Sequence, residues 1–348
     1  MRVMVAMSGG VDSSVAAALA RDEGHEVVGV TLKLWGGESD SGCCSVADVD
    51  DARRVAQQLG IDHHVFGFAD EFTRFVVEPY VADHAAGRTP NPCVECNRHL
   101  KFDRLLRRAR ALGFDAVATG HHARIVERPD GTRRVARGAD RAKDQSYVLH
   151  VLDQARLART MLPVGHLTKA EVRAHAAALG LRSAAKPDSQ DVCFVAATRG
   201  RARFLGDRIP LHPGRVIERD GTQVGRVDAV EMVTIGQRSG LGVSGTGRRR
   251  YAVAVDVGAR TVTVGDEPDL LVATQPLEGL TWVDGPVGGA TVDAQCSAHG
   301  VARPATVVSR RRGGAAELRW VEPGRRVAPG QSVVLYERDE VVGGATAA

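Results

Sequence analysis

The stretch from Ala6 to Ser14, A-M-S-G-G-V-D-S-S, constrains what this chain can fold into more than any other. It follows a short apolar run, Val3 to Met7, and opens a segment rich in alanine and valine that ends near Gly24. This order predicts a buried strand, a tight glycine turn and a helix. A helix that begins in such a turn directs unpaired N–H groups and its positive dipole end at the turn, which favours a bound phosphate.

The residues of the turn narrow the kind of phosphate site. The P-loop of kinases and GTPases requires G-x-x-x-x-G-K-[ST], with a lysine that reaches the terminal phosphates. This turn has no lysine, and Asp12 stands where the turn meets the helix. The pattern S-G-G-x-D-S instead resembles the pyrophosphate loop of ATP pyrophosphatases, which cleave ATP between the α- and β-phosphates and adenylate an acceptor oxygen. We expect the hydroxyl groups of the turn to add hydrogen-bond donors: Ser8, Ser13 and Ser14.

Alternating strand and helix patterns follow the turn. The expected strands are 26–34, 64–68 and 116–119, and the expected helices are 46–59, 70–85 and 102–112. This alternation predicts an α/β fold with a parallel, Rossmann-like sheet covered by helices on both faces. Because ligands bind at the carboxyl ends of such strands, we expect four segments to converge there: residues 8–14, 32, 91–97 and 120–122.

The second half of the chain has a different pattern. From about residue 206 glycines become frequent and short β-branched runs replace the helical periodicity, and Pro268 and Pro276 predict a boundary. The short strands beyond it predict a small β-barrel, and the last few residues are expected to be disordered. We therefore predict three domains: a catalytic domain at 1–205, a mixed, β-rich central domain at 206–275 and a C-terminal β-barrel at 276–348.

Composition limits the partners and the compartment. The net charge of +4 is mild, so nucleic-acid binding must come from local patches such as the arginines between 98 and 110, 248–250 and 310–312. The sequence has no run that reads as a signal peptide or a membrane span, so we expect a cytoplasmic protein with reduced cysteines. Only five of the 46 basic residues are lysines, which suggests that those positions require a compact ammonium group.

Three of the six cysteines carry the chemical signal. Cys93 and Cys96 form a C-x-x-C in what reads as a loop, T-P-N-P-C-V-E-C-N, and Cys193 lies in K-P-D-S-Q-D-V-C-F. Structural zinc would need four ligands, and no second pair appears. Cysteines in an electropositive cleft beside a helix start are nucleophilic, and Lys101 and Lys186 supply charge nearby in the sequence. The remaining cysteines are expected to be bystanders: Cys43, Cys44 and Cys296.

The ordered set of motifs resembles one family. The glycine turn is followed by T-P-N-P-C-V-E-C-N-R-H-L-K-F, A-T-G-H-H, K-D-Q-S-Y, P-V-G, K-x-D-S-Q-D-V-C-F, G-Q-R-S-G-L-G and P-G-Q. Together they are similar to the tRNA-specific 2-thiouridylases, which replace O2 of the wobble uridine with sulfur in tRNAs for Lys, Glu and Gln. The similarity runs from residue 3 to about residue 336. It implies a catalytic domain like those of adenine nucleotide alpha hydrolases.

The resemblance also implies a role for each matched residue. Cys96 would be the nucleophile, and Cys193 would carry a persulfide. ATP, with Mg²⁺, would bind at Ala6, Met7, Ser8, Gly9, Gly10, Val11, Asp12, Ser13, Leu32 and Gly120. The tRNA anticodon loop would contact His121, Lys143, Asp144, Gln145 and, in the barrel, Gln331. A cysteine desulfurase or a relay protein would donate the sulfur.

Two positions depart from the family pattern. Many members have aspartate, a candidate general base, where this chain has Cys93, and many have tyrosine where it has His122, for which we expect a stacking role. Three cysteines around one site could instead hold a [4Fe–4S] cluster with an open iron, so the persulfide relay is our first hypothesis and the cluster our second. Two other classes stay open: a pyrophosphate-loop synthetase that adenylates a small metabolite, and a non-catalytic nucleotide- or RNA-binding protein.

Overall fold

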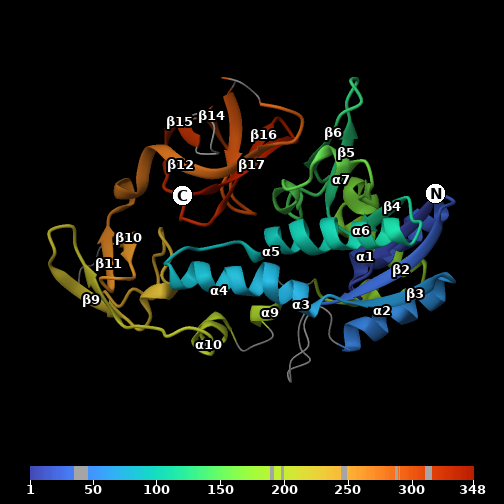
Figure 1. Ribbon diagram of the computed structural model, residues 1–348, viewed down its shortest axis with the longest axis horizontal. Coiled ribbons are helices and arrows are strands. Elements are labelled where there is room, and N and C mark those ends of the chain that lie inside the picture. Colours follow the sequence, from blue (N-terminus) through green and yellow to red (C-terminus); the bar gives the residue numbers. More distant parts are fainter. Residues whose placement is uncertain are drawn as a thin grey trace.

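The computed structural model describes residues 1–34, 46–188, 192–196, 200–243, 249–286, 289, 291–309 and 316–348. Cys43, Cys44, Arg248 and the arginine run 310–312, which the sequence singled out, lie outside the described residues. The described chain forms three sheets, and Figure 1 shows the first at the N-terminal end, the second at the far end and the third above the helices between them. No helix within the described ranges has the length and apolar character that crossing a bilayer would require.

The first sheet is parallel, with the strand order β3-β2-β1-β4-β7. Its strands are β1 (Arg2–Ala6), β2 (Glu26–Lys33), β3 (Asp62–Gly67), β4 (Ala116–Thr119) and β7 (Thr160–Met161). The helices of this part are α1 (Val11–Asp22), α2 (Val46–Leu59), α3 (Ala69–Phe72), α4 (Glu78–Ala85), α5 (Pro92–Glu95), α6 (Leu105–Ala111), α7 (Gln154–Leu157), α8 (Lys169–Ala178), α9 (Cys193–Ala196) and α10 (Arg201–Gly206).

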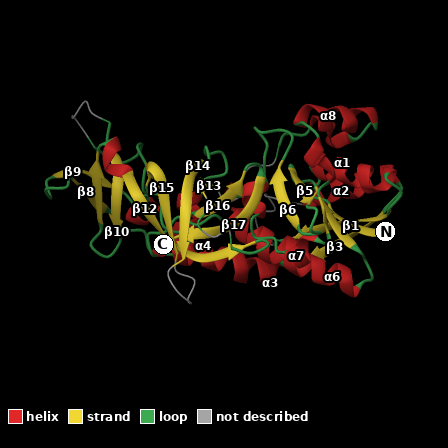
Figure 2. Ribbon diagram, turned by 90° about the horizontal axis from the view of Figure 1, so that it is seen from above, coloured by secondary structure: helices red, strands yellow, loops and turns green. Residues whose placement is uncertain are grey.

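The alternating side chains of β1 divide the core into two layers. Val3 and Val5 pack with α1, α2 and α8 on one face, whereas Met4 packs with Phe72 and Leu105 on the other. Figure 2 shows the same arrangement, with α8, α1 and α2 on one side of the sheet and α3 and α6 on the other. The predicted α/β sheet with helices on both faces is therefore confirmed.

The second sheet is small and mixed, with the order β10-β11-β8-β9. Its strands are β8 (Gly214–Ile217), β9 (Gln223–Val227), β10 (Tyr251–Asp256) and β11 (Thr261–Gly265). Valines dominate its separate core, among them Val216, Val227 and Val262. Short β-branched strands of this kind are what the sequence pattern predicted for this region.

The third sheet closes into a six-stranded antiparallel barrel, because β12 at one end also pairs with β17. Its strands are β12 (Leu271–Trp282), β13 (Thr291–Gln295), β14 (Arg303–Ser309), β15 (Ala316–Arg325), β16 (Ser332–Glu337) and β17 (Glu340–Ala347). Leu318, Val333 and Val342 belong to its buried core. The predicted C-terminal barrel is confirmed.

The prediction of a disordered C-terminus was wrong, because residues 340–347 form the strand that closes the barrel. This strand is closely packed, because a Cβ on Gly343 would stand 2.5 Å from the Thr281 carbonyl oxygen. Pro276 was expected to mark a break, but it lies inside β12 just where this strand changes partner from β15 to β17. There its carbonyl oxygen accepts a hydrogen bond from Ala348.

A hairpin of the first domain joins the barrel. Strands β5 (Ala123–Glu127) and β6 (Arg133–Arg137) pair with each other, and β6 also pairs with β17 through Ala136 and Glu340. Beside this pairing the buried Arg134 donates to Asp284 at 2.7 Å and to Glu337 at 2.8 Å. These contacts fix the barrel to the hairpin. The loop that follows the hairpin lines the pocket described below.

We predict that Gly344→Ala destabilises the protein by about 1–3 kcal/mol, the usual cost of overpacking. A Cβ at Gly344 would stand 2.3 Å from the ring of His150, which is buried and cannot move aside. The measurement is the midpoint of urea denaturation. Gly67→Ala is the matched control, because Gly67 has open space around its Cβ position. A Gly344→Ala protein as stable as the wild type would mean that the C-terminal strand is not packed there.

Candidate active site

A pocket of about 600 Å³ lies where the carboxyl ends of the first sheet meet the helix after Asn91. Most of the residues singled out from the sequence line it: Ala6, Met7, Ser8, Asp12, Ser13, Leu32, Cys93, Cys96, Gly120, His121, Lys143, Asp144, Gln145 and Cys193. Gly9, Gly10, Val11 and Gln331 are not among the lining residues. The convergence of strand-end segments expected from the parallel sheet is therefore present in the structure.

The glycine turn is packed tightly against its surroundings. Gly9 has a φ of +73°, and a Cβ there would stand 2.4 Å from the Asp48 carbonyl oxygen. A Cβ on Gly120, at the end of β4, would stand 2.5 Å from the Ser13 backbone nitrogen. Both positions therefore need glycine. The Gly120 contact places the end of β4 directly against the first turn of α1.

The serine hydroxyl groups of the turn have different surroundings. Ser8 N donates to Ser13 Oγ at 3.1 Å, and the two hydroxyl groups lie 3.3 Å apart. The Ser13 hydroxyl, which lines the pocket, also donates to the Gly10 carbonyl oxygen at 3.1 Å. Ser14 is fully buried and its hydroxyl donates to the Gly10 carbonyl oxygen at 2.8 Å. The expectation that Ser14 would offer a donor to a ligand was therefore wrong. Its hydroxyl closes the helix start instead, a local use of serine that competes with ligand binding.

Asp12, in the first turn of α1, is held by two partners. Lys169 Nζ lies 2.7 Å from each of its carboxylate oxygens, and His122 Nε2 lies 3.0 Å from Oδ1. Burial on its own would raise the pKa of Asp12, but the hydrogen bonds from His122 and Lys169 outweigh it and lower that pKa. Asp12 is therefore a carboxylate at neutral pH.

Asp188 continues this chain of ion pairs. Its carboxylate contacts Lys143 at 2.7 Å, Lys169 at 2.9 Å and Arg173 at 2.8 Å. Burial opposes ionisation, yet hydrogen bonds from Lys143 and Lys169 hold the pKa of Asp188 well below its usual value. The pocket therefore has a charged side built from carboxylates and ammonium groups, with Lys169 as the shared member.

Sequence reasoning missed Lys169 and Asp188 as site residues. Lys169 was the one lysine neither in nor beside a segment that carries the family resemblance. The signal that could have found it is the scarcity of lysine, since three of the five lysines line this pocket: Lys101, Lys143 and Lys169. Ala298 and His299 of the barrel also line it, and neither was assigned a role from the sequence.

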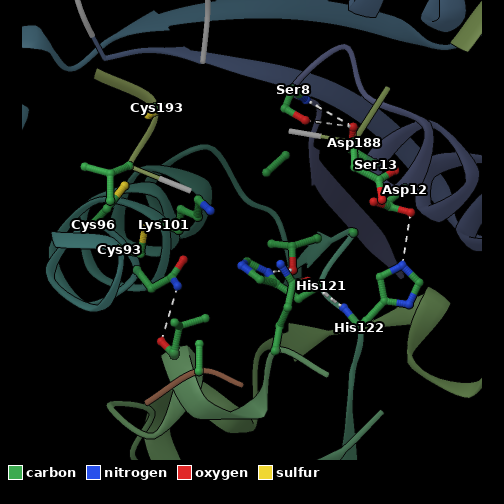
Figure 3. Close-up of a pocket in the computed structure, with 18 of the residues that line it drawn as sticks. Ser8, Asp12, Ser13, Cys93, Cys96, Lys101, His121, His122, Asp188 and Cys193 are labelled. Carbon is green, nitrogen blue, oxygen red and sulfur yellow. Dashed lines mark hydrogen bonds and ion pairs between the residues drawn. The ribbon is translucent and has the colours of Figure 1, made fainter. Parts of the chain in front are cut away.

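The cysteines occupy the opposite side of the pocket. Figure 3 shows Cys93, Cys96 and Cys193 gathered there with Lys101, across from Ser8, Asp12 and Ser13. All three cysteines are half-buried. The C-x-x-C was expected in a loop, and this was wrong, because helical structure begins at Pro92 and continues to Ala111.

The start of this helix explains the error. Pro92 occupies the first helical position, where its missing N–H costs nothing, and the Asn91 side chain accepts a hydrogen bond from Cys93 N at 3.1 Å. The prolines thus open a helix rather than break one. Cys93 and Cys96 consequently lie in its first two turns, and the positive end of a helix favours negative charge such as a thiolate.

The two histidines after β4 are both buried. His121 Nδ1 lies 2.8 Å from Thr119 Oγ1, and burial, with positive charge at Lys101 and His122, lowers the pKa of His121 well below its usual value. His121 is therefore neutral at pH 7. His122 is only 3% exposed and contacts Asp12, but it lines the pocket, so the stacking role expected for it stays a prediction.

Three residues that the resemblance assigned to tRNA have internal partners for their side chains. Asp144 accepts hydrogen bonds from Arg137, Gly138 N and the Ser146 hydroxyl. Gln145 Oε1 accepts from His122 N at 2.9 Å, and Gln331 Nε2 donates to the Thr89 carbonyl oxygen at 2.5 Å. In this structure Asp144 and Gln145 brace the pocket wall, and Gln331 ties the barrel to the segment before the cysteine helix.

The arrangement of His, Cys, Asp and Glu side chains decides whether the protein could hold a metal ion. Across the described ranges, no three or more His, Cys, Asp or Glu side chains are arranged so that they could hold a metal ion. As placed here, the three cysteines do not fit the ligand set of a [4Fe–4S] cluster, and no step below is routed through one.

Three family models match the chain in succession. They are described as a tRNA methyl transferase HUP domain over residues 1–197, a tRNA methyl transferase PRC-barrel domain over 202–266 and an aminomethyltransferase beta-barrel domain over 277–347. Fold and pocket thus define a tRNA-modifying enzyme with a nucleotide-binding α/β domain and two β domains.

Whole-chain relatives identify the family. The tRNA-specific 2-thiouridylase MnmA of Roseiflexus sp. is 47% identical, covering 99% of this chain and 98% of its own length. That of Mycolicibacterium smegmatis is 46% identical over 99% of both chains. The protein belongs to the tRNA-specific 2-thiouridylase family, a family of sulfurtransferases. A solved 4-thiouridine synthetase–RNA complex with bound ATP is 19% identical with a TM-score of 0.38, covering 58% of this chain and 46% of that one, too distant to support an argument.

We predict that His121→Asn flattens the pH dependence of stability. Because the pKa of His121 is lowered in the folded protein, the unfolded chain takes up a proton first as the pH falls. The stability due to the neutral imidazole is complete above the unfolded pKa of about 6.5 and is lost below it at about 1.4 kcal/mol per pH unit. The measurement is the urea midpoint between pH 7.5 and 5.

His64→Asn is the control for this experiment, since His64 is exposed and should leave the pH slope unchanged. An equal slope in wild type and His121→Asn would show that His121 is not buried in its neutral form.

Proposed function

We propose that this protein catalyses the ATP-dependent 2-thiolation of the wobble uridine in tRNAs for Lys, Glu and Gln, in the cytoplasm. The single observation that supports this most is the pocket itself, which has the glycine turn with Asp12 on one side and three cysteines on the other. A reaction that first activates an oxygen with ATP and then replaces it with sulfur needs both sides within reach of one base.

The glycine-turn side would bind ATP and activate the uridine. The N–H groups at the start of α1 suit its phosphates, and Mg²⁺ would arrive with the nucleotide and screen their charge. The uridine O2 attacks the α-phosphorus, the bond to the β-phosphate breaks and pyrophosphate leaves. With loss of the N3 proton, C2 is then bonded through O2 to AMP, a far better leaving group than the original oxygen.

The cysteine side would deliver the sulfur. The terminal sulfur of a Cys193 persulfide attacks C2, and AMP departs with the O2 oxygen and the bonding electron pair. The Cys96 thiolate then attacks Cys193 Sγ, which breaks the S–S bond, leaves sulfur on C2 and forms a Cys96–Cys193 disulfide. An external thiol reduces this disulfide, and a cysteine desulfurase or relay protein restores the persulfide.

The tRNA would present its anticodon loop with the target base splayed out, which costs little in single-stranded RNA. His121 and Lys143, at the pocket wall, are contacts that the family resemblance implies. The exposed arginines of the cysteine helix would bind phosphates beside the loop, among them Arg107, Arg108 and Arg110. Arg108 also lies 5.4 Å from the Phe66 ring, so part of its role is structural.

For the domain organisation we propose the three parts that the sequence indicates: 1–205 for catalysis, 206–275 as the connecting β-rich domain and 276–348 as the barrel. Pairing of β6 with β17 supports a rigid joint between the first and third parts. In this proposal the barrel contributes to the site through Ala298 and His299.

We predict that anaerobically purified protein converts unmodified tRNA transcript to 2-thiouridine with ATP, Mg²⁺, a thiol reductant and a cysteine desulfurase that forms the persulfide from L-cysteine, and that Cys96→Ser and Cys193→Ser each abolish the product. Nucleoside mass spectrometry measures the product, and iron is assayed in the same sample. Cys296→Ser is the matched control, because Cys296 is half-buried like the others but does not line the pocket. It should retain full activity.

The other outcomes separate the rival functions. Activity confined to iron-containing protein would replace the persulfide relay with a cluster held by Cys93, Cys96 and Cys193. A methylated nucleoside formed from S-adenosylmethionine would support the methyl transferase wording of two family-model descriptions. ATP turnover with a small acceptor and no tRNA would indicate a metabolite synthetase.

We predict that Arg108→Glu combined with Arg110→Glu weakens tRNA binding about tenfold or more and reduces the slope of affinity against salt concentration by about two ions. Filter binding at several salt concentrations measures both. Arg203→Glu is the control, because it reverses the charge of an exposed arginine on α10, away from the cysteine helix. It should leave the affinity for tRNA unchanged. Unchanged affinity in the double variant would mean that these arginines face solvent and do not contact tRNA.

A further inference from the structure

We propose that Lys169 and Lys143 form the subsite for the β- and γ-phosphates of ATP, with the Asp188 carboxylate holding the two ammonium groups side by side. This inference rests on the proposed ATP-dependent function and adds the residues that would grip the leaving pyrophosphate. It also moves Lys143 from the tRNA contacts, where the family resemblance put it, to the nucleotide.

The first observation is the missing lysine of the glycine turn. In the G-K-[ST] type of loop, one lysine reaches the terminal phosphates from within the loop. Here the turn has Asp12 instead, and the ammonium group of Lys169 lies 2.7 Å from both of its carboxylate oxygens. A lysine from the first residue of α8 thus stands at the start of α1, although it is far away in the sequence.

The second observation is the spacing of the two lysines. Asp188 contacts Lys143 through Oδ2 at 2.7 Å and Lys169 through Oδ1 at 2.9 Å, so one carboxylate aligns both ammonium groups. Lys169 is 12% exposed and Lys143 is 44% exposed. Lys143 is therefore open to a ligand, while Lys169 lies deeper in the pocket.

The third observation is the charge balance. Asp12 and Asp188 supply two negative charges to a chain of ion pairs that contains three cations: Lys143, Lys169 and Arg173. A third carboxylate, Asp140, accepts a hydrogen bond from Lys169 N at 3.0 Å, so the cluster is close to neutral and the helix start is what favours an anion beside it. A terminal phosphate oxygen can replace one of the two Asp12 oxygens on Lys169, because the ammonium group then still has three acceptors.

Lysine suits this exchange better than arginine. An ammonium group is a compact charge that can pass between acceptors by rotating its stem, whereas a guanidinium is a rigid planar fork. The chain uses arginine at 41 of its 46 basic positions, yet it has lysine at both of these. Lys101 also lines the pocket, but Figure 3 places it on the cysteine side.

The test compares the affinity for ATP with that for AMP, which lacks the β- and γ-phosphates, by equilibrium dialysis without tRNA. Lys169→Met should weaken ATP binding by about tenfold or more and change AMP binding less than about twofold, as expected for a lost charge-assisted contact. Lys143→Met should weaken ATP binding by about threefold or more, again without an effect on AMP. Its exposed position keeps this variant folded if Lys169→Met does not fold.

Lys186→Met is the matched control. Lys186 also bridges two carboxylates, Asp48 at 2.7 Å and Asp51 at 2.8 Å, but it does not line the pocket, so both affinities should stay within about twofold. Equal losses for ATP and AMP in the two test variants, or no loss in either, would overturn the inference. So would a Lys143→Met protein that loses tRNA affinity in filter binding while it keeps ATP affinity. A wild-type protein that does not bind ATP at all would instead contradict the proposed function.

Discussion

The ion-pair chain from Asp12 through Lys169 to Asp188 is the interaction on which the site depends most. It joins three segments that are distant in the sequence: the start of α1, the start of α8 and the residues that lead toward Cys193. Burying a carboxylate costs free energy unless a cation is paired with it. Each of these segments must therefore stay where its charged side chain meets the opposite charge on the next segment. The Gly120 contact with Ser13 N adds a steric constraint, because it fixes how closely β4 approaches the same helix start.

The barrel also shapes the pocket, because its residues contact those that form the pocket wall. Arg137 donates to Asp144 and lies 3.9 Å above the Tyr336 ring of β16, while the Ser146 hydroxyl contacts both Asp144 and Tyr336. The pocket wall around Asp144 is thus built jointly by the hairpin β5–β6 and by the barrel. Gln331, which does not line the pocket, adds a further tie between the barrel and the segment before the cysteine helix.

The sequence predicted those parts of the fold that local patterns determine. The alternation of apolar patterns located strands and helices of the first sheet. A strand buries one or both faces and a helix buries one apolar stripe, so each leaves its own spacing of apolar residues in the sequence. It failed where long-range contacts override a local signal. The last residues were expected to be disordered, but they form β17, which pairs with β12 to close the barrel. Lys169 was missed for the same reason, because only the folded chain brings it to Asp12.

The replacement of an acid by Cys93 is not offset by another carboxylate of the pocket. Among the described lining residues the carboxylates are Asp12, Asp144 and Asp188. Hydrogen bonds from cationic partners lower the pKa of Asp12 and Asp188, which makes both weaker bases, and Asp144 accepts bonds from Arg137, Gly138 and Ser146. For the proposed reaction this leaves the imidazole and cysteine side chains of the pocket as the groups that would take the proton from uridine N3. His121 stays neutral at pH 7 because burial disfavours its charged form. Its ring can accept a proton, but the protonated ring is destabilised by this burial.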